Sequence, residues 1–174
     1  PVDLVSLVPV KRSHSVCAQG GINACNEIAR QQGYSEYEHF DETIYGGDFL
    51  ADQHPVLEMA NWAPKIIDLL DRMGVPFNRT PEGLLDFRRF GGTLFHRTAF
   101  AGATTGQQLL YALDEQVRRF ETMPVENEKG VVLRGEKMVK KWELWDFLGI
   151  VQDDTGRAIG IVAQDLRSEE RRVG

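Results

Sequence analysis

The sequence has few cysteines and no long uninterrupted apolar run. Its two cysteines, Cys17 and Cys25, are too few for a disulfide framework, and their spacing is not that of a CxxC metal site. The four histidines follow neither an HxxxH nor an HExxH pattern, so we predict no metal centre. No apolar stretch is long enough to cross a bilayer and no signal-peptide pattern is present, so membrane association is expected only through a partner.

A block of basic residues is also missing. Twenty lysines and arginines stand against 26 aspartates and glutamates, which gives a net charge of −6. Nucleic-acid binding proteins concentrate positive charge on one face or segment, so we predict no nucleic-acid partner. The remaining composition, 42% apolar and 26% charged, is ordinary for a globular protein with a buried core.

Both ends of the sequence suggest a piece of a longer chain. An apolar strand pattern begins directly after Pro1, and we expect residues 1–166 to be an internal fragment of one domain. The last octapeptide, RSEERRVG, carries five charged residues and resembles translated read-through of a sequencing adapter. We therefore predict that residues 167–174 form a non-native tail that stays unpaired and exposed.

The periodicity of apolar residues predicts an α/β or α+β fold in which helices, strands and hairpins are mixed. Strands are expected at 4–8, 144–151 and 158–165, and a hairpin at 77–87. Helices are expected at 22–32, at 35–45, at 55–73 with a kink or break at Pro64, and from Thr105 onward. Residues 121–141 are expected to be a surface excursion, and Asp114 is expected to pair with Arg118 on the solvent side of its helix.

Three segments have a composition that packing alone does not explain. The segment SHSVCAQGG follows a strand, and its adjacent glycines would let backbone N–H groups approach a nucleotide at the edge of a sheet. A simple tight turn explains Gly-Gly equally well, and a histidine such as His14 near glycines is most often a solvent-facing loop residue. The segment YGGDFLADQ is best interpreted as a helix cap followed by a loop.

The third segment, RRFGGTLFHRTAFAGATTG, places Arg88, Arg89 and Arg97 near four glycines. These arginines either line a site for an anionic ligand or are solvated loop residues. A nucleotide-binding interpretation also requires a GxGxxG motif in the first strand–turn–helix unit. That motif is absent from the sequence, and we expect it to precede Pro1.

Four motifs occur in order: RSHSVCAQGGIN, HFDETIYGGDFLADQ, LLDRMGVPFNRTPEGLLDFRRFGGT and HRTAFAGATTGQQLLYALDEQVRR. Together they closely resemble the flavoprotein subunit of succinate dehydrogenase and fumarate reductase, and most of all the branch with a diheme cytochrome b anchor. The resemblance covers most of residues 2–166 and departs at 24–34 and 124–141. It implies a partial Rossmann-like FAD-binding domain with helices and β-hairpins.

The resemblance also implies how FAD is bound. The histidine of the family's R-S-H-[ST] motif, which bonds covalently to the 8α carbon of the flavin, corresponds to His14. A neutral imidazole nitrogen is a competent nucleophile toward the electron-poor flavin methyl group, and the bond raises the reduction potential of the flavin. The implied cofactor-binding residues are Ser6, Ser13, His14, Ser15, Ala18, Gln19, Gly20 and Gly21.

Further positions match family segments that lie near the substrate and the flavin ring. Phe90 and the Gly91-Gly92 pair match the FGG segment beside the bound dicarboxylate. A second segment, near the isoalloxazine ring, is matched by Arg97, Thr98, Thr105 and Gly106. The catalytic arginine and the groups that clamp the substrate carboxylates belong to later parts of the family chain, so we expect the 174 residues alone to be inactive.

The whole protein is thereby expected to oxidise succinate to fumarate, or the reverse, and to pass electrons to an iron–sulfur subunit. A cytochrome b membrane anchor is the second expected partner, which implies a peripheral position on the cytoplasmic face of the inner membrane. Two alternatives remain. L-aspartate oxidase shares the AQGG loop but is expected to lack the flavin-linking histidine, and a non-catalytic nucleotide-binding domain is expected if the chain is complete.

Overall fold

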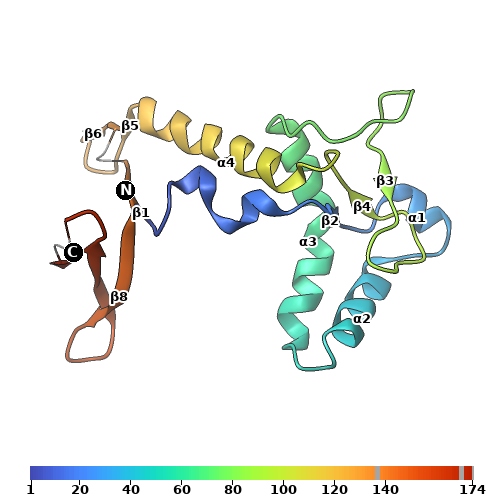
Figure 1. The fold of residues 1–174 in the computed structure, drawn as a ribbon, viewed down its shortest axis with the longest axis horizontal. Coiled ribbons are helices and arrows are strands. Elements are labelled where there is room, and N and C mark those ends of the chain that lie inside the picture. The colour runs from blue at the N-terminus through green and yellow to red at the C-terminus, as the bar shows by residue number, and fades with distance from the viewer. Residues whose placement is uncertain (136–137, 169–170, 174) are drawn as a thin grey trace. The chain divides into compact units, whose positions relative to one another are not determined.

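The computed structural model describes residues 1–135, 138–168 and 171–173, which divide into two compact units (Figure 1). The strand unit comprises Pro1–His14 together with Leu113–Gly174. The helical unit comprises Ser15–Ala112. Each unit has its own secondary structure, and together they have the mixed helix and strand content that the sequence predicts.

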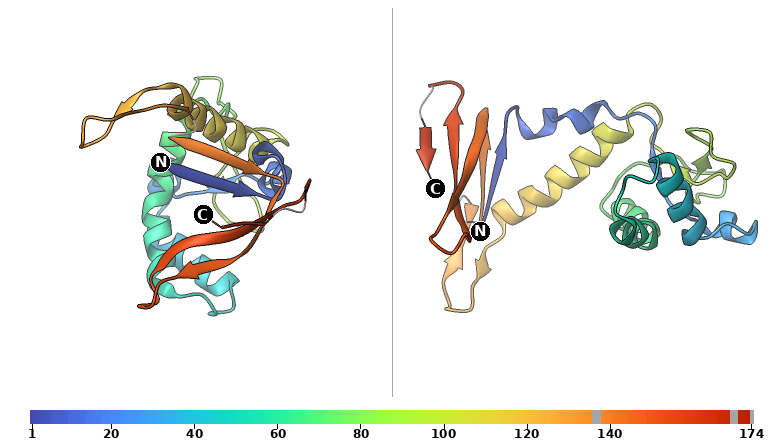
Figure 2. Two further views of the ribbon diagram at one scale, coloured as in Figure 1. Left: turned by 90° about the vertical axis from the view of Figure 1, so that its left-hand side faces the viewer. Right: turned by 90° about the horizontal axis from the view of Figure 1, so that it is seen from below.

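The strand unit is built around two sheets. Strand β1 (Val2–Ser6) pairs in parallel with β7 (Val139–Glu143), so that Ser6 lies beside Glu143 at the carboxyl ends of both strands. Strand β8 (Trp145–Gln152) pairs antiparallel with β9 (Ala158–Asp165), and Figure 2 shows this long hairpin. Two short strands, β5 (Val125–Glu126) and β6 (Val132–Leu133), form a separate hairpin.

The turn between β8 and β9 is fixed by Asp153. Its carboxylate accepts hydrogen bonds from Thr155 N at 2.9 Å and Arg157 N at 3.1 Å, and Gly156 takes a positive φ of 81°. Aspartate and glycine are the residues that such a turn favours, because aspartate bonds the backbone ahead of it and glycine adopts positive φ without strain. The predicted strand pair around DDTG is confirmed.

Two predictions for the strand unit are wrong. Residues 121–141 are more than a surface excursion, since β7 begins at Val139 and is the direct neighbour of β1. The tail was expected to be unpaired, but β10 (Arg171–Val173) pairs antiparallel with β9. Backbone pairing needs no particular side chain, so a charged segment can extend a sheet that its composition does not predict.

The helical unit contains a small sheet and three complete helices. Strands β2 (Ile22–Asn23), β4 (Thr98–Ala99) and β3 (Phe87–Arg88) form the sheet in that order, with antiparallel pairing. The helices are α1 (Glu27–Gln31), α2 (Glu36–Gly46) and α3 (Gln53–Arg72), and α2 packs against α3. Helix α4 (Thr105–Thr122) begins in this unit, and its residues from Leu113 belong to the strand unit.

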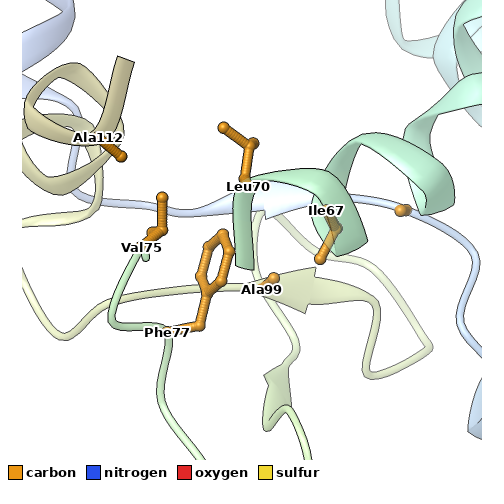
Figure 3. Close-up of a cluster of buried hydrophobic side chains, with 7 residues drawn as sticks. Ile67, Leu70, Val75, Phe77, Ala99 and Ala112 are labelled. Atoms are coloured by element: carbon orange, nitrogen blue, oxygen red, sulfur yellow. The ribbon is translucent and has the colours of Figure 1, made fainter. Parts of the chain in front are cut away.

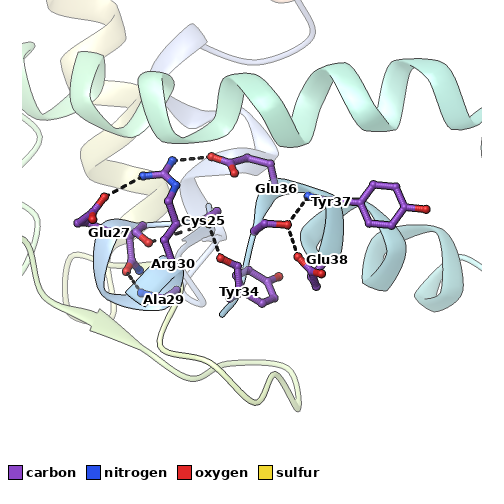
Figure 4. Close-up of polar contacts among 10 residues, drawn as sticks. Cys25, Glu27, Ala29, Arg30, Tyr34, Glu36, Tyr37 and Glu38 are labelled. Carbon is purple, nitrogen blue, oxygen red and sulfur yellow. Dashed lines mark hydrogen bonds and ion pairs between the residues drawn. The ribbon is translucent and has the colours of Figure 1, made fainter. Parts of the chain in front are cut away.

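The first residue of each of two helices is determined by a side chain that accepts a hydrogen bond from the first turn. Ser35 Oγ accepts a hydrogen bond from Tyr37 N at 3.2 Å and donates one to the Glu38 carboxylate, so Ser35 caps α2 at the predicted position (Figure 4). Asn26 Oδ1 accepts from Ala29 N at 2.9 Å, so α1 starts after Asn26, whereas a helix was predicted from residue 22. Pro64 lies inside α3, which continues through it without a break.

The larger of two clusters of buried apolar side chains in the helical unit lies beneath α3 (Figure 3), and the smaller consists of Cys25, Ala29 and Tyr34. The larger cluster contains Ala24, Ile67, Leu70, Val75, Phe77, Ala99 and Ala112. The predicted apolar stripe of α3 is only partly buried, because Met59 and Ile66 are exposed. In α4, Leu113 and Phe120 were expected to be buried and are also exposed. Over the described ranges, no helix is long and apolar enough to cross a membrane.

Candidate functional site

Apart from Ser6, which ends β1, the predicted cofactor residues lie on one loop that follows this strand, residues 10–21, here called the His14 loop. It contains two short 3₁₀ turns, Val10–Arg12 and His14–Cys17. Arg12 N donates to Pro9 O at 2.7 Å, and Ala18 N donates to Ser15 O at 3.1 Å. His14 is exposed on this loop, which leaves its imidazole accessible to a ligand.

The part of the loop in the strand unit borders a groove of about 940 Å³ at the carboxyl end of β1. The groove brings together three predicted residues, Ser6, Ser13 and His14, with Trp145 and Phe147 from β8. Val10 N donates to Glu143 Oε1 at 2.9 Å, which ties the start of the loop to the end of β7. Ligands of α/β proteins bind at the carboxyl ends of strands, and this groove has that position.

The part of the loop in the helical unit is held by the start of α4. Gly106 N donates to Ala18 O at 2.8 Å. A Cβ atom at Gly106 would lie 2.0 Å from Ser15 O and 2.8 Å from Ala18 Cβ, so only glycine permits this approach. The predicted residues Ser15 and Ala18 are therefore positioned by the backbone of Gly106, and both are exposed.

Gly106→Ala is expected to push the first turn of α4 away from the His14 loop and to lower the free energy of unfolding by roughly 1–3 kcal/mol, the usual cost of overpacking. Thermal unfolding measures the change. The control is Gly46→Ala, because a Cβ at Gly46 meets nothing within 4 Å. Equal midpoints for the two variants would contradict the close approach.

Of the two glycines at the end of the loop, Gly21 is sterically required by its backbone, whereas Gly20 lies close to a side chain that can move. Gly21 has a φ of 112°, and a Cβ there would lie 2.4 Å from Ala99 O. A Cβ at Gly20 would lie 2.6 Å from the ring of Phe90. Gln19, Gly20 and Phe90 line a hollow of about 340 Å³, whose other lining residues are Arg88, Gly102 and Ala103. Gly91, the other predicted substrate-side residue, is exposed and does not line this hollow.

The three arginines of the glycine-rich segment differ in environment. Arg89 is exposed, as a solvated loop residue would be. Arg88 donates from Nη2 to Gln19 O at 3.0 Å and to Gly20 O at 2.6 Å. Arg97 is buried, with its Nη2 2.9 Å from Glu42 Oε2. Two of the three arginines therefore have protein partners that the sequence did not predict.

The Arg97–Glu42 pair belongs to a buried polar cluster. Tyr34 OH donates to Glu42 Oε2 at 2.8 Å, and burial together with this bond raises the pKa of Tyr34. Burial, followed by the nearby Arg97 cation, lowers the pKa of His39. Arg97 Nε and Nη1 have no hydrogen-bond partner among the residues that the structure describes. Through the Arg97–Glu42 pair, the cluster connects the residue that precedes β4 to α2.

Asp114 is a second buried ionic residue, and the sequence-based prediction of its exposure is wrong. Asp114 was expected to face solvent, but its side chain is only 3% exposed. It accepts hydrogen bonds from Arg118 at 2.7 Å and Lys141 at 3.1 Å, and Lys11 Nζ lies 3.6 Å from it. Burial alone would raise the pKa of Asp114, but the bonds from Arg118 and Lys141 outweigh it and hold that pKa below its ordinary value. The signal was available, since Asp114 follows the partly buried Leu110 by four residues and so shares its helix face.

No group of three or more His, Cys, Asp or Glu side chains that could hold a metal ion occurs among the described residues. Both cysteines are free, Cys17 exposed and Cys25 buried, and burial raises the pKa of the Cys25 thiol. The Cys25 thiol contacts the carbonyl oxygens of Tyr34 at 3.7 Å and Asn26 at 3.9 Å, and Arg30 is paired with Glu27 and Glu36 (Figure 4). The groove, the exposed histidine and the close-approach glycines instead suit an organic cofactor with a phosphate-bearing part.

Comparison with known proteins identifies that cofactor. The sequence model of the FAD binding domain matches residues 1–173. The chain belongs to this FAD-binding family. The match confirms the predicted fold class, and the relatives described next confirm the resemblance to succinate dehydrogenase and fumarate reductase flavoproteins.

Individual relatives agree with the family. The chain is 64% identical to the succinate dehydrogenase flavoprotein subunit of Bacillus subtilis (strain 168) over 165 residues, which are 95% of this chain and 26% of that protein. It is 36% identical to the fumarate reductase flavoprotein subunit of Escherichia coli (strain K12) over 126 residues, 69% of this chain and 20% of that one. A solved structure of a variant of E. coli quinol fumarate reductase matches with a TM-score of 0.77 at 31% identity, covering 94% of this chain and 24% of that chain.

The FAD-binding chain thus spans about a quarter of the length of the curated relatives that it matches. The family model extends through the paired strand Arg171–Val173. Within the His14 loop, Ser13 and His14 border the groove of the strand unit, and Gln19 and Gly20 line the hollow beside Phe90 in the helical unit.

Proposed function

We propose that the chain is part of a succinate dehydrogenase or fumarate reductase flavoprotein that carries FAD covalently on His14. The observation that carries the proposal is the exposed imidazole of the RSHS motif at the rim of the groove after β1. The 64% identity to a succinate dehydrogenase flavoprotein subunit supports the same assignment. Because the relatives are about four times as long, the activity belongs to a longer flavoprotein that contains residues 1–166, and 167–174 remain proposed as a non-native tail.

In this proposal each part of the site has a separate task. His14 provides the nitrogen that bonds to the 8α carbon of the flavin, and Ser6, Ser13 and Ser15 provide hydrogen-bonding groups beside it. The backbone N–H groups of Gln19, Gly20 and Gly21 approach the cofactor, because the two glycines have no side chain. Ala18, whose N–H is bonded to Ser15 O, borders the cofactor with its small side chain. Phe90 and Gly91 lie on the substrate side. When bound, the flavin supplies the hydride acceptor for succinate oxidation, and the protein positions and tunes it.

The partners follow from the same assignment. We propose that electrons pass to an iron–sulfur subunit and then to a cytochrome b membrane anchor, so that the flavoprotein lies peripherally on the cytoplasmic face of the inner membrane. The reaction belongs to the tricarboxylic acid cycle and to electron transport. Succinate oxidation and fumarate reduction would use the same residues of this chain.

Substrate choice tests the proposal against its two alternatives. The purified full-length flavoprotein is expected to reduce an artificial electron acceptor with succinate and to show no activity with L-aspartate. Activity with L-aspartate and no covalent flavin would identify an L-aspartate oxidase. FAD binding without turnover of either substrate would favour a non-catalytic domain, and both of these results would contradict the proposed function.

A further inference from the structure

Arg88 contacts both segments that the proposed function places around the flavin and its substrate. Its backbone is fixed at the end of β3, where Arg88 pairs with Thr98 of β4. From there Nη2 donates to the carbonyl oxygens of Gln19 at 3.0 Å and Gly20 at 2.6 Å. A hydrogen bond from an ionised donor is stronger than one between neutral groups, and here a single guanidinium nitrogen donates to two consecutive carbonyls.

The same guanidinium lies over two aromatic rings. Its Cζ is 4.3 Å from the ring centroid of Phe100 and 5.4 Å from that of Phe90. These distances are within the range of a cation–π interaction. The edge of the Phe90 ring also lies against Gly20, where a Cβ would approach it to 2.6 Å. Arg88, Gly20 and Phe90 therefore form one contact set, which lines the hollow of about 340 Å³.

The carbonyl contacts determine the direction of two backbone donors. In a planar trans peptide unit, C=O and N–H point in opposite directions. Since the carbonyls of Gln19 and Gly20 point toward Arg88, the N–H groups of Gly20 and Gly21 point away from it. Glycine has the widest backbone freedom of any residue, so these peptide units depend on an external contact for a fixed orientation.

We propose that Arg88 is a positioning residue of the FAD site. Through its bonds to the Gln19 and Gly20 carbonyls, it orients the N–H groups of Gly20 and Gly21 toward FAD. Its guanidinium, which lies over the Phe90 ring, holds that ring against the substrate. The proposal rests on the proposed function for the identity of the substrate. It assigns Arg88 no contact with substrate or flavin. Arg88 is thus distinct from Arg89, the adjacent arginine, which is exposed.

The test compares Arg88→Gln, Arg88→Lys and Arg89→Gln in the full-length flavoprotein, with thermal unfolding as a check of folding. Arg88→Gln is expected to raise KM for succinate about tenfold, the effect of losing one charge-assisted hydrogen bond. We expect kcat to fall less than about threefold, because the covalent bond at His14 still holds the flavin. Arg88→Lys is expected to recover part of the loss, since an ammonium group reaches one carbonyl but cannot stack as a planar guanidinium does.

Arg89→Gln removes the same charge one residue away and is expected to leave KM unchanged. An unchanged KM in Arg88→Gln, or an equal rise in Arg89→Gln, would overturn the proposal. A lysine variant as impaired as the glutamine variant would contradict the carbonyl contacts. If the wild-type protein does not oxidise succinate, the proposed function fails, and FAD affinity becomes the measure of the role of Arg88. FAD binding about tenfold weaker in Arg88→Gln, but not in Arg89→Gln, supports that role. An FAD affinity of Arg88→Gln equal to that of the wild type overturns it.

Discussion

His14→Ser in the full-length flavoprotein is expected to leave FAD bound but no longer covalently attached, and to reduce succinate oxidation far more than fumarate reduction. Serine is small enough to be accommodated on this exposed loop, and the glycine contacts of the site remain, so the fold and most of the FAD affinity are retained. Without the bond the reduction potential of the flavin falls, and about 30 mV on a two-electron couple corresponds to roughly 1.4 kcal/mol. A flavin of lower potential is a poorer hydride acceptor and a better donor, which explains the asymmetry.

Acid precipitation followed by flavin fluorescence of the denatured protein measures this prediction. The wild-type protein should retain its flavin in the pellet, and His14→Ser should release it to the supernatant. His54→Ser is the matched control, because His54 is an exposed histidine on α3 outside the site. Flavin retained in the pellet of His14→Ser would show that another residue carries the bond.

Asp114→Asn is expected to destabilise the protein by about 3 kcal/mol, the lower end of the cost of breaking a buried ion pair. Lys141, which is 18% exposed, would be left with Glu121, whose Oε1 lies 3.1 Å from its Nζ. Lys11 and Arg118 are about half exposed and can turn to solvent, so their contribution is smaller. Chemical denaturation measures the difference, and the exposed neighbour Glu115→Gln should change stability by less than about 0.5 kcal/mol.

The pH dependence of stability gives this prediction a second readout. The folded protein holds the pKa of Asp114 below its ordinary value of 3.8, so the stabilisation is fully present above that pH and is lost as the pH falls through the folded pKa. The difference between wild type and Asp114→Asn should therefore be constant at neutral pH and shrink in acid. A difference that does not change with pH would mean that the charge of Asp114 is not what stabilises the fold.

Local signals predicted much of the fold correctly. The serine of S-x-x-E at Ser35 and the DDTG turn at Asp153 both act within a few residues of their own position, so sequence spacing suffices to find them. Strand β7 was missed because its partner β1 lies more than 130 residues away, and a parallel pair has no local turn to mark it. The burial of Asp114 could have been inferred from its spacing to Leu110, but its pairing with Lys11 and Lys141 could not, because both are distant in sequence.

In the candidate site too, features that are local in sequence were predicted and long-range contacts were not. The His14 loop is recognisable because its motif is contiguous, and the structure places Ser6, Ser13 and His14 around one groove. The sequence marked the arginines of the glycine-rich segment as candidate ligand-binding residues, but it did not predict the partners of their side chains. Only the folded chain shows that Arg88 bonds two carbonyls and that Arg97 pairs with Glu42.

The central claim is that His14 carries FAD, and peptide mass mapping of the wild-type flavoprotein tests it most directly. After denaturation and proteolysis, the peptide that contains His14 is expected to carry the added mass of one FAD, and fragmentation should locate that mass on the imidazole. Recovery of this peptide unmodified, with the flavin free in solution or attached to a different peptide, would contradict the account.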